Sequence, residues 1–228
     1  MSLHSPPIPR SCLRQVPRRS RALILEAAVR EFSKGGIAGA RTEAIAKMAG
    51  VNKALLHYYF KDKEGLYGAV LEEVFGGLRT ACEPAWQGNS APMAKLLAYV
   101  ECHFDYVAAH PLYPRILQCE LLRVGAGEGT RFGELVQSYF GPIYARLEEV
   151  IREGIAGGEF RPVDPRHFIS SMTSVIVCYF NSAPVIRLVA GIEPFEPERI
   201  AERRAAVLDF IAAALGERPF GKLERARA

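Results

Sequence analysis

Basic, aromatic and hydrogen-bonding side chains are concentrated between residues 41 and 63 of the sequence. Lysine and arginine pair with phosphates, and lysine, asparagine, histidine and tyrosine can hydrogen-bond to phosphates or base edges. The spacing therefore predicts contacts to a DNA duplex, with flanking groups positioning the protein and one short helix reading the bases. The predicted DNA-binding residues are Arg41, Thr42, Asn52, Lys53, Ala54, Leu55, His57, Tyr58, Tyr59, Lys61 and Lys63.

Two short helices joined by a tight turn would hold these groups outward. The small side chain of Ala46 lets the second helix approach the first, and Gly50 can adopt the positive φ of a sharp turn. Thr42 and Asn52 are residue types suited to cap the first and the second helix. Such a second helix fits the major groove of B-DNA. The inward-facing anchors are expected to be Ile45, Ala49, Val51, Leu56 and Tyr59.

Charge is unevenly spread along the chain. Residues 1–63 carry twelve Lys or Arg against four Asp or Glu, and the remainder carries seventeen against twenty-one, which together give the net charge of +4. A basic front end on a mildly acidic body indicates a polyanionic partner at one end. On charge alone, a solvated basic face is an equally good interpretation.

Apolar residues recur with helical spacing almost throughout, from Arg18 onward. No strand-like alternation of useful length and no internal repeat occurs in the sequence, so the predicted fold class is all-α. Asp164 precedes a proline suited to a first helical turn, and the helix that starts there is expected to run through Phe180, with a bend near Pro184. Longer helices are expected over 18–34, 63–82, 92–109, 113–124, 131–156, 165–180 and 197–215.

Several classes of protein are not indicated. The five cysteines form no CxxC pair, so a disulfide framework or zinc finger is not expected, and reduced thiols in a cytoplasm are. The N-terminus lacks the apolar stretch of a signal peptide, and the longest apolar run, Val175 to Phe180, is too short to span a bilayer. Common enzyme motifs are missing from the sequence. We therefore expect a cytoplasmic protein that is not an enzyme, with no cofactor, metal or membrane partner.

One pattern in the region of the two short helices is specific. It consists of Arg41-Thr42, Ile45-Ala46, Ala49-Gly50-Val51, Leu56, Tyr59-Phe60, Lys63-Glu64 and Leu66. This pattern resembles the TetR family of transcription regulators, and the strong similarity covers about residues 18–70. The resemblance implies that Asn52–Tyr59 is the recognition helix and that Thr42, Tyr59 and Lys63 contact the DNA backbone. His57, Tyr58 and Leu55 depart from the residues common in the family, which leaves base identity open.

The rest of the chain resembles the ligand-binding and dimerisation domain of that family more loosely. The similar features are His110-Pro111 at a helix end and Gly158–Arg161 leading into Asp164-Pro165. The expected domains are a disordered arm (1–17), a three-helix helix-turn-helix domain (18–66), a larger helical ligand-binding and dimerisation domain (67–215) and a flexible tail (216–228).

The resemblance implies a small-molecule pocket among the middle helices. Its predicted lining is Trp86, Leu97, His103, Phe104, Tyr106, Tyr113, Leu117, Gln118, Leu121, Arg123 and Asn181. Plain core packing is the simpler interpretation for each aromatic residue. His103 and His110 lie seven apart beside Cys102, but satisfied or surface histidines are simpler than a metal site.

The resemblance also implies a dimer in which the last two long helices of each subunit form a four-helix bundle. The predicted interface is Phe168, Met172, Val175, Ile176, Tyr179, Val207, Leu208 and Ile211, because both helices carry broad apolar stripes. The alternative is that these residues form a monomer core. Two-fold symmetry would match a palindromic operator, with recognition helices roughly 34–36 Å apart.

The expected function is that of a ligand-responsive transcriptional regulator. By resemblance it is a repressor that binds its operator as a homodimer and is released by a small, largely apolar effector. The helix over Lys63–Cys82 would join the two parts. The alternative is a redox- or metal-sensing regulator that uses the scattered cysteines and histidines, although their spacing pairs none of them.

Overall fold

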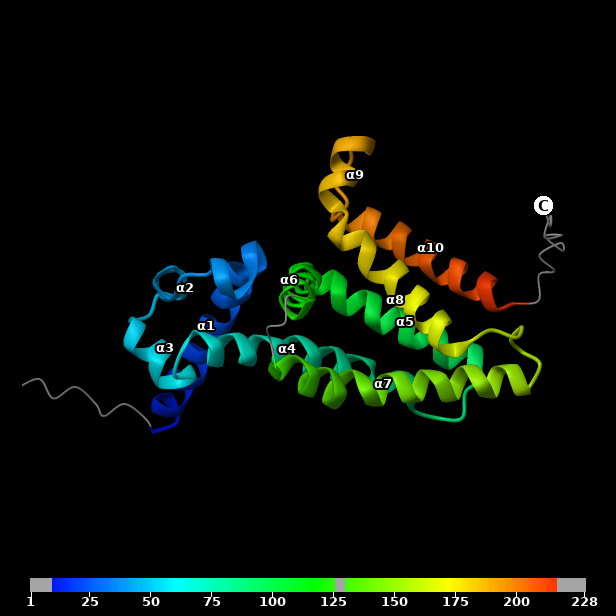
Figure 1. Ribbon diagram of the computed structural model, residues 1–228, viewed down its shortest axis with the longest axis horizontal. Coiled ribbons are helices and arrows are strands. Elements are labelled where there is room, and N and C mark those ends of the chain that lie inside the picture. The colour runs from blue at the N-terminus through cyan, green and yellow to red at the C-terminus, as the bar shows by residue number, and fades with distance from the viewer. Residues whose placement is uncertain (1–9, 126–129, 217–228) are drawn as a thin grey trace, which may run out of the picture. The chain divides into compact units, whose positions relative to one another are not determined.

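The computed structural model describes residues 10–125 and 130–216, and every regular element in that part is a helix (Figure 1). The predicted all-α fold class is therefore confirmed. In chain order the elements are α1 (Arg10–Gly39), α2 (Thr42–Ala49), α3 (Lys53–Phe60), α4 (Lys63–Cys82), the 3-10 helix η1 (Glu83–Trp86), α5 (Pro92–Ala109), α6 (Tyr113–Gly125), α7 (Thr130–Ala156), α8 (Pro165–Asn181), α9 (Ala183–Ala190) and α10 (Pro197–Leu215).

Helix ends that are marked by a capping residue, a proline or a glycine lie where the sequence predicts them. The elements α4, α5 and α10 begin and end where the spacing predicts. Asp164 caps α8, since its carboxylate accepts hydrogen bonds from the backbone N–H groups of Arg166 and His167 at 2.8 and 3.2 Å. Polar helix caps and prolines in the first turn act within a few residues, so sequence alone locates them well.

Two predicted helix boundaries differ from the structure. The helix predicted over 18–34 begins earlier, at Arg10, inside the predicted arm, while its predicted end is confirmed by the non-helical backbone at Gly35 and Gly36 that interrupts α1. The helix predicted to run through Phe180 ends at Asn181, but in place of the bend expected near Pro184 a separate helix, α9, begins at Ala183. Pro184 lies in the first turn of α9, where its missing N–H has no helical acceptor.

No single described helix is long and apolar enough to cross a membrane. Only α8 and α9 taken together, which are bent by 64° relative to each other, have the length and composition of a membrane span.

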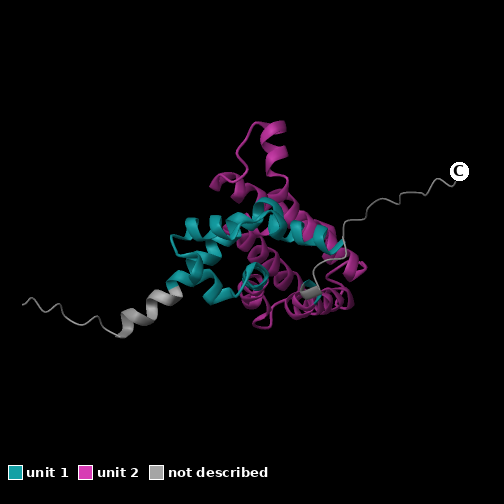
Figure 2. Ribbon diagram, turned by 60° about the vertical axis from the view of Figure 1, so that its left-hand side comes forward, with its two compact units in different colours: residues 1–74, 115–133 teal, residues 75–114, 134–228 magenta. Residues whose placement is uncertain are grey.

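The chain divides into two compact units, residues 1–74 with 115–133 and residues 75–114 with 134–228 (Figure 2). The core of the first unit is built on side chains that water does not reach, namely Phe32, Ile45, Leu56, Leu66 and Ile116. The core of the second unit includes Leu96, Phe104, Leu147, Ile151, Met172, Ile176 and Ile211. Residues 1–9 of the predicted arm and 217–228 of the predicted tail lie outside the described residues, and the domain division at 66/67 stays a prediction.

Candidate nucleic-acid interface and the other predicted sites

The turn between α2 and α3 has the geometry that the residue types require. Gly50 adopts φ 65° and ψ 32°, and its N–H is bonded to the last carbonyls of α2. Val51 then donates to the Ala46 carbonyl at 3.0 Å. The side chain of Asn52 accepts a hydrogen bond from the Ala54 N–H at 2.9 Å, so it caps α3 as predicted. A residue with a Cβ atom would be strained at Gly50.

The start of α2 is held differently from the prediction. Thr42 is the first helical residue rather than the cap, and its hydroxyl donates to Glu43 at 3.4 Å. The cap position belongs to Arg41, whose N–H donates to the Glu31 carboxylate at 3.5 Å. Glu31 lies on α1 and is nearly buried, and a hydrogen bond from Lys34 at 2.7 Å holds its pKa below the usual range. The partner at the start of α2 is therefore Glu31, ten residues before Arg41, and not the predicted Thr42.

Two residues anchor α3 to the first unit. Leu56 is 0% exposed and Phe60 is 5% exposed, while Tyr59, the predicted second anchor, is only half-buried. The guanidinium of Arg21 lies 5.3 Å from the centre of the Phe60 ring. Because Leu56 and Phe60 are four residues apart, they lie on the same face of the helix.

The opposite face of α3 carries the predicted reading groups. Lys53, Ala54 and His57 are exposed, Leu55 is half-buried, and Tyr58 is 78% exposed. The ammonium group of Lys53 pairs with the Glu43 carboxylate on α2. The His57 Nδ1 lies 2.8 Å from the Lys61 carbonyl oxygen, and Nδ1 must therefore donate. This bond orients the ring and leaves Nε2 as the atom that can meet a base or phosphate.

The link from α3 to α4 is tight. Lys61 has φ 66° and ψ −59°, and the Asp62 N–H donates to the Phe60 carbonyl at 2.8 Å, which is the geometry of a γ-turn. The Asp62 carboxylate accepts from the Gly65 N–H at 2.7 Å and so caps α4. A Cβ atom on Gly65 would lie 2.1 Å from the Phe60 oxygen, so only glycine fits. Asp62 was not predicted from the sequence as a cap, although an acidic residue just before a helical pattern is a recognised signal of a helix start.

The two lysines predicted to contact phosphates differ in exposure and in their hydrogen bonds. Lys61 is exposed, whereas Lys63 is half-buried and donates to the Ala40 carbonyl at 3.3 Å. An ammonium group has three protons, so Lys63 can tie α4 to the segment before α2 and still contact a phosphate.

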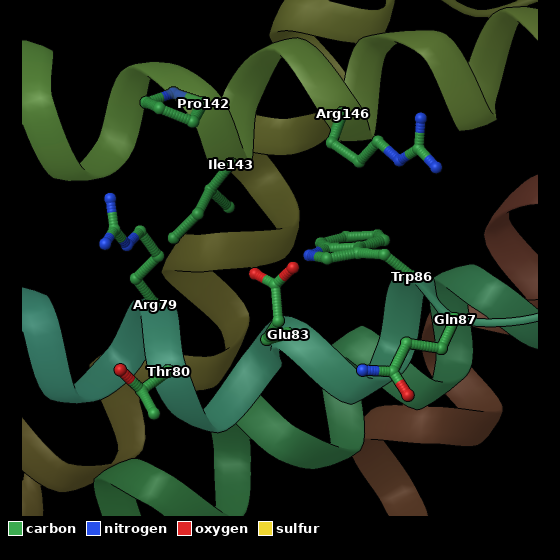
Figure 3. Close-up of a pocket in the computed structure, with 8 residues that line it drawn as sticks. All are labelled: Arg79, Thr80, Glu83, Trp86, Gln87, Pro142, Ile143 and Arg146. Carbon is green, nitrogen blue, oxygen red and sulfur yellow. The ribbon is translucent and has the colours of Figure 1, made fainter.

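A cleft of about 690 Å³ lies in the second unit between α4, η1 and α7 (Figure 3). Trp86 lines it and is the one predicted ligand-binding residue that does so. Figure 3 shows Arg79 and Arg146 on either side of Glu83 and Trp86. These charged residues were not predicted to share a site, because they lie on three separate elements. The full lining is Arg79, Thr80, Glu83, Trp86, Gln87, Pro142, Ile143 and Arg146.

Aromatic contacts lead from Trp86 into the core. The Trp86 ring stacks on Tyr99 with a centroid distance of 5.3 Å, and the Tyr99 hydroxyl lies 3.1 Å from the His103 Nδ1. Burial lowers the pKa of His103 to about 4, so the imidazole is neutral at neutral pH. Burial also raises the pKa of Tyr99. His103 is thus a buried histidine with a hydrogen-bond partner.

The other predicted ligand-binding residues are not gathered around this cleft. Phe104 is fully buried and lies 5.4 Å from the Phe180 ring, while Tyr106 and Tyr113 contact His110. The Oδ1 atom of Asn181 is buried and has no hydrogen-bond partner among the described residues. Leu117 is half-buried, Gln118 and Leu121 are exposed, and these three belong to the other unit.

The predicted dimer-interface residues separate into two groups. Met172, Ile176, Val207 and Ile211 are at most 1% exposed within a single chain, because α8 and α10 both pack on α5. These four are core residues of one subunit, as in the alternative interpretation. Phe168, Val175, Tyr179 and Leu208 are half-buried and retain surface that a second chain can cover.

The thiols and candidate metal ligands are scattered. Cys82, Cys102, Cys119 and Cys178 are free, and burial raises the pKa of Cys82 to about 12. In residues 10–125 and 130–216, the structure has no group of three or more His, Cys, Asp or Glu positioned to hold a metal ion. The side chain of Cys12 lies outside the described residues.

Comparisons with known proteins agree with this geometry. The family model of bacterial regulatory proteins of the tetR family matches residues 24–70, and the tetracyclin repressor-like C-terminal domain model matches residues 92–211. The HTH-type transcriptional regulator RutR of Escherichia coli is 33% identical over 183 residues, covering 76% of this chain and 82% of RutR. The HTH-type transcriptional repressor NicS of Pseudomonas putida is 34% identical, covering 72% of this chain and 76% of NicS.

Solved structures with the same fold are more distant in sequence. The ketosteroid regulator KstR2 of Mycobacterium tuberculosis has a TM-score of 0.72 at 18% identity, covering 87% of this chain and 95% of KstR2. The regulator FadR of Bacillus subtilis, in complex with stearoyl-CoA, has a TM-score of 0.64 at 19% identity, covering 85% and 98%. With both regions matched by family models and RutR aligned over most of its length, the chain belongs to the TetR family of bacterial transcriptional regulators.

Proposed function

We propose that this protein is a ligand-responsive repressor that binds a palindromic operator as a homodimer and is released by a small-molecule effector. The observation that carries the proposal is the outer face of α3, where Lys53, His57 and Tyr58 are exposed opposite two buried anchors. The names of the relatives support the regulatory part, since RutR is a transcriptional regulator and NicS is a repressor.

The groups around α3 divide into two roles in this proposal. Arg41, Thr42, Lys61 and Lys63 flank the helix and bind phosphates, which sets the register on the duplex. The residues of the exposed face then meet base edges in the major groove. They are Asn52, Lys53, Ala54, Leu55, His57 and Tyr58, while the half-buried Tyr59 is assigned to the DNA backbone with the flanking groups.

A binding measurement tests the DNA contact directly. A duplex is selected from a pool with a random centre, and its affinity is measured by fluorescence anisotropy at several salt concentrations. Affinity should fall steeply with salt, because phosphate contacts release counterions. Tyr58→Ala should weaken binding about tenfold, while Tyr144→Ala, which changes an exposed tyrosine of α7, should not. Failure of the chain to enrich or bind any duplex at low salt would contradict the proposal.

The homodimer is proposed from symmetry and from the remaining surface of α8 and α10. A two-fold dimer presents two recognition helices to one duplex, and roughly 34–36 Å between them would match successive major grooves. The half-buried residues Phe168, Val175, Tyr179 and Leu208 are the proposed contacts. The selected duplex should therefore contain two inverted half-sites, which sequencing of the enriched pool reveals.

The effector is proposed to bind the cleft beside Trp86. Its volume is in the range that small-molecule sites occupy. Ile143, Pro142 and the Trp86 ring offer an apolar surface to a largely apolar body. The two guanidinium groups against the single carboxylate of Glu83 leave the lining with a net positive charge, which favours an acidic group on the effector.

The sole tryptophan of the chain lines this cleft, so its fluorescence reports directly on binding there. Octanoate, octanol and octylammonium share one apolar chain and differ in head-group charge. Octanoate should change the Trp86 emission at the lowest concentration and should release the duplex. Arg146→Gln should weaken octanoate and leave octanol unchanged. An unaltered emission with all three, alongside ligand-induced DNA release, would place the effector elsewhere.

Release is proposed to be a shift between two populated states. An effector can reduce operator affinity only by the ratio of its own affinities for the two states. The continuous helix α4 links the helix-turn-helix region to the cleft. Lys63 at its start is hydrogen-bonded to the Ala40 carbonyl, and Arg79 near its end lines the cleft.

A further inference from the structure

The helix α9 presents an uncovered apolar face. Leu188 is 86% exposed and Val189 is 82% exposed, which makes them the most exposed large hydrophobic residues in the described part of the chain. Val185 is 59% exposed and Ile192, just after the helix, is 37% exposed. Figure 1 shows α9 projecting from the other helices of its unit. A contiguous apolar group of this kind is typical of an interaction surface.

The position of α9 is held by several contacts to its own chain. Ala183 at its start is buried, and the Tyr179 hydroxyl on α8 donates to the Pro194 carbonyl at 2.8 Å. The Phe180 and Phe195 rings stack with a centroid distance of 6.1 Å. The helix is therefore fastened at its base and by the segment that follows it, while its apolar face remains uncovered.

The single charged residue of α9 is neutralised within the chain. Arg187 donates to both carboxylate oxygens of Glu193 at 2.6 and 2.7 Å, and its guanidinium lies 5.4 Å from the Phe195 ring centre. The Arg187 side chain is thus engaged with its own segment, and Val185, Leu188 and Val189 remain as the uncovered side chains.

The stretch that leads into α9, including most of α8, carries no charged residue. No Asp, Glu, Lys or Arg occurs from Phe168 to Ile186, although 24% of the chain is charged. This stretch has surface positions, since Ser170, Ser171, Ser174 and Cys178 are exposed. Solvent-facing helices usually carry charges, whereas charged residues are depleted at the cores of protein interfaces.

We infer that α9 is an intersubunit clasp whose apolar face, formed by Val185, Leu188 and Val189, docks on a second copy of this chain. The inference rests on the proposed homodimer and extends it beyond the α8–α10 contact. A stable interface buries about 800 Å² per partner, more than one eight-residue helix can supply, so the partner must also cover the adjoining surface of α8. The uncovered apolar side chains of α9 continue from a stretch of α8 without charged residues, and such a surface can pair with the same surface of a second copy, as a two-fold interface requires.

The test uses one substitution and a matched control in the full chain. Leu188→Glu places a carboxylate in the centre of the α9 face. Leu122→Glu makes the same change at a leucine of α6 that is 72% exposed and lies in the other unit. Both positions are helical and exposed, so circular dichroism should show unchanged folding for both variants. Sedimentation velocity over a range of concentrations then gives each dimer dissociation constant.

The expected result is a wild-type dimer, a Leu188→Glu dimer weakened by a factor on the order of ten or more, and a Leu122→Glu dimer equal to wild type. A Leu188→Glu dimer as strong as wild type overturns the clasp and leaves the proposed homodimer intact. A wild type that is monomeric at every concentration overturns both. Co-sedimentation of a monomer with phosphatidylcholine–phosphatidylglycerol vesicles, abolished by Leu188→Glu, would assign the face to a lipid surface and also overturn the clasp.

Discussion

The eight-residue helices α3 and α9 have equal lengths and opposite surface chemistry. α3 exposes Lys53, His57 and Tyr58, whereas α9 exposes Val185, Leu188 and Val189. Both are held by contacts to the rest of their own unit, so neither surface results from a loose segment. The difference indicates different partners, because a charged and hydrogen-bonding face suits a polyanion and an uncharged apolar face suits another protein surface.

The largest effect should come from the anchor that aims α3 outward. Leu56→Ala removes a side chain that is 0% exposed and should cost about 3 kcal/mol of unfolding free energy. Leu55→Ala, at the half-buried neighbouring position, should lower the unfolding free energy much less. Urea denaturation compares the two variants. Equal losses would show that the two faces of α3 are not distinct in the way the burial indicates.

A second prediction concerns the pH dependence of stability, which should come from a buried histidine in the core of the second unit. The buried His103 in the second unit has its pKa lowered to about 4, below the ordinary value of 6.5, so the unfolded chain binds the proton more readily. Stability contributed by the neutral ring is present above pH 6.5 and is lost as the pH falls toward 4. The loss between pH 7 and pH 5 should be about 2 kcal/mol.

Urea denaturation of wild type and His103→Gln at the two pH values isolates this contribution. The variant should lose less stability on acidification, and His167→Gln, which changes an exposed histidine of α8, should behave like wild type. Identical pH dependence in wild type and His103→Gln would rule out the proposed linkage.

A third prediction concerns the charge balance beside α3. The Glu43 carboxylate pairs with Lys53 and places a negative charge on the surface proposed to face phosphates. Glu43→Gln should raise duplex affinity several-fold by freeing Lys53 and removing repulsion. Glu134→Gln, an exposed residue of the second unit, should leave the affinity unchanged. Weaker binding by Glu43→Gln would mean that the ion pair positions Lys53 for the DNA rather than competing with it.

The smallest predicted effect is at the γ-turn after α3. Lys61 has a positive φ that costs a residue with a Cβ atom about 1 kcal/mol. Lys61→Gly should therefore be more stable than Lys61→Ala, while both lose the same proposed phosphate contact. Thermal unfolding and anisotropy measure the two quantities separately. A glycine variant no more stable than the alanine variant would show that the turn is not strained.

Local signals in the sequence were sufficient for much of the fold. Helical periodicity and punctuation by glycine and proline predicted α4, α5 and α10 to the residue, and short-range geometry predicted the Gly50 turn and the Asn52 cap. The face of α3 followed from periodicity except at Tyr59. These features depend on interactions within about four residues, which a sequence displays directly.

Features that depend on distant partners were not predictable in this way. The sequence could not show that Glu31 meets the Arg41 N–H, or that Arg79, Glu83 and Arg146 surround one cleft with Trp86. Met172 and Val207 have the residue types of an interface, yet packing on α5 buries them within one subunit. An apolar stripe in the sequence indicates that the surface must be buried, but not which part of the same chain or of another chain buries it.

The sequence by itself determined an all-helical chain with a helix-turn-helix whose outer face is basic, aromatic and polar. Tertiary structure decided which apolar stripes are already covered, leaving Leu188 and Val189 uncovered while hiding Ile176 and Ile211. The physical reason is that hydrophobic burial has no direction and no sequence range, so the partner of each apolar surface is chosen only when the whole chain packs.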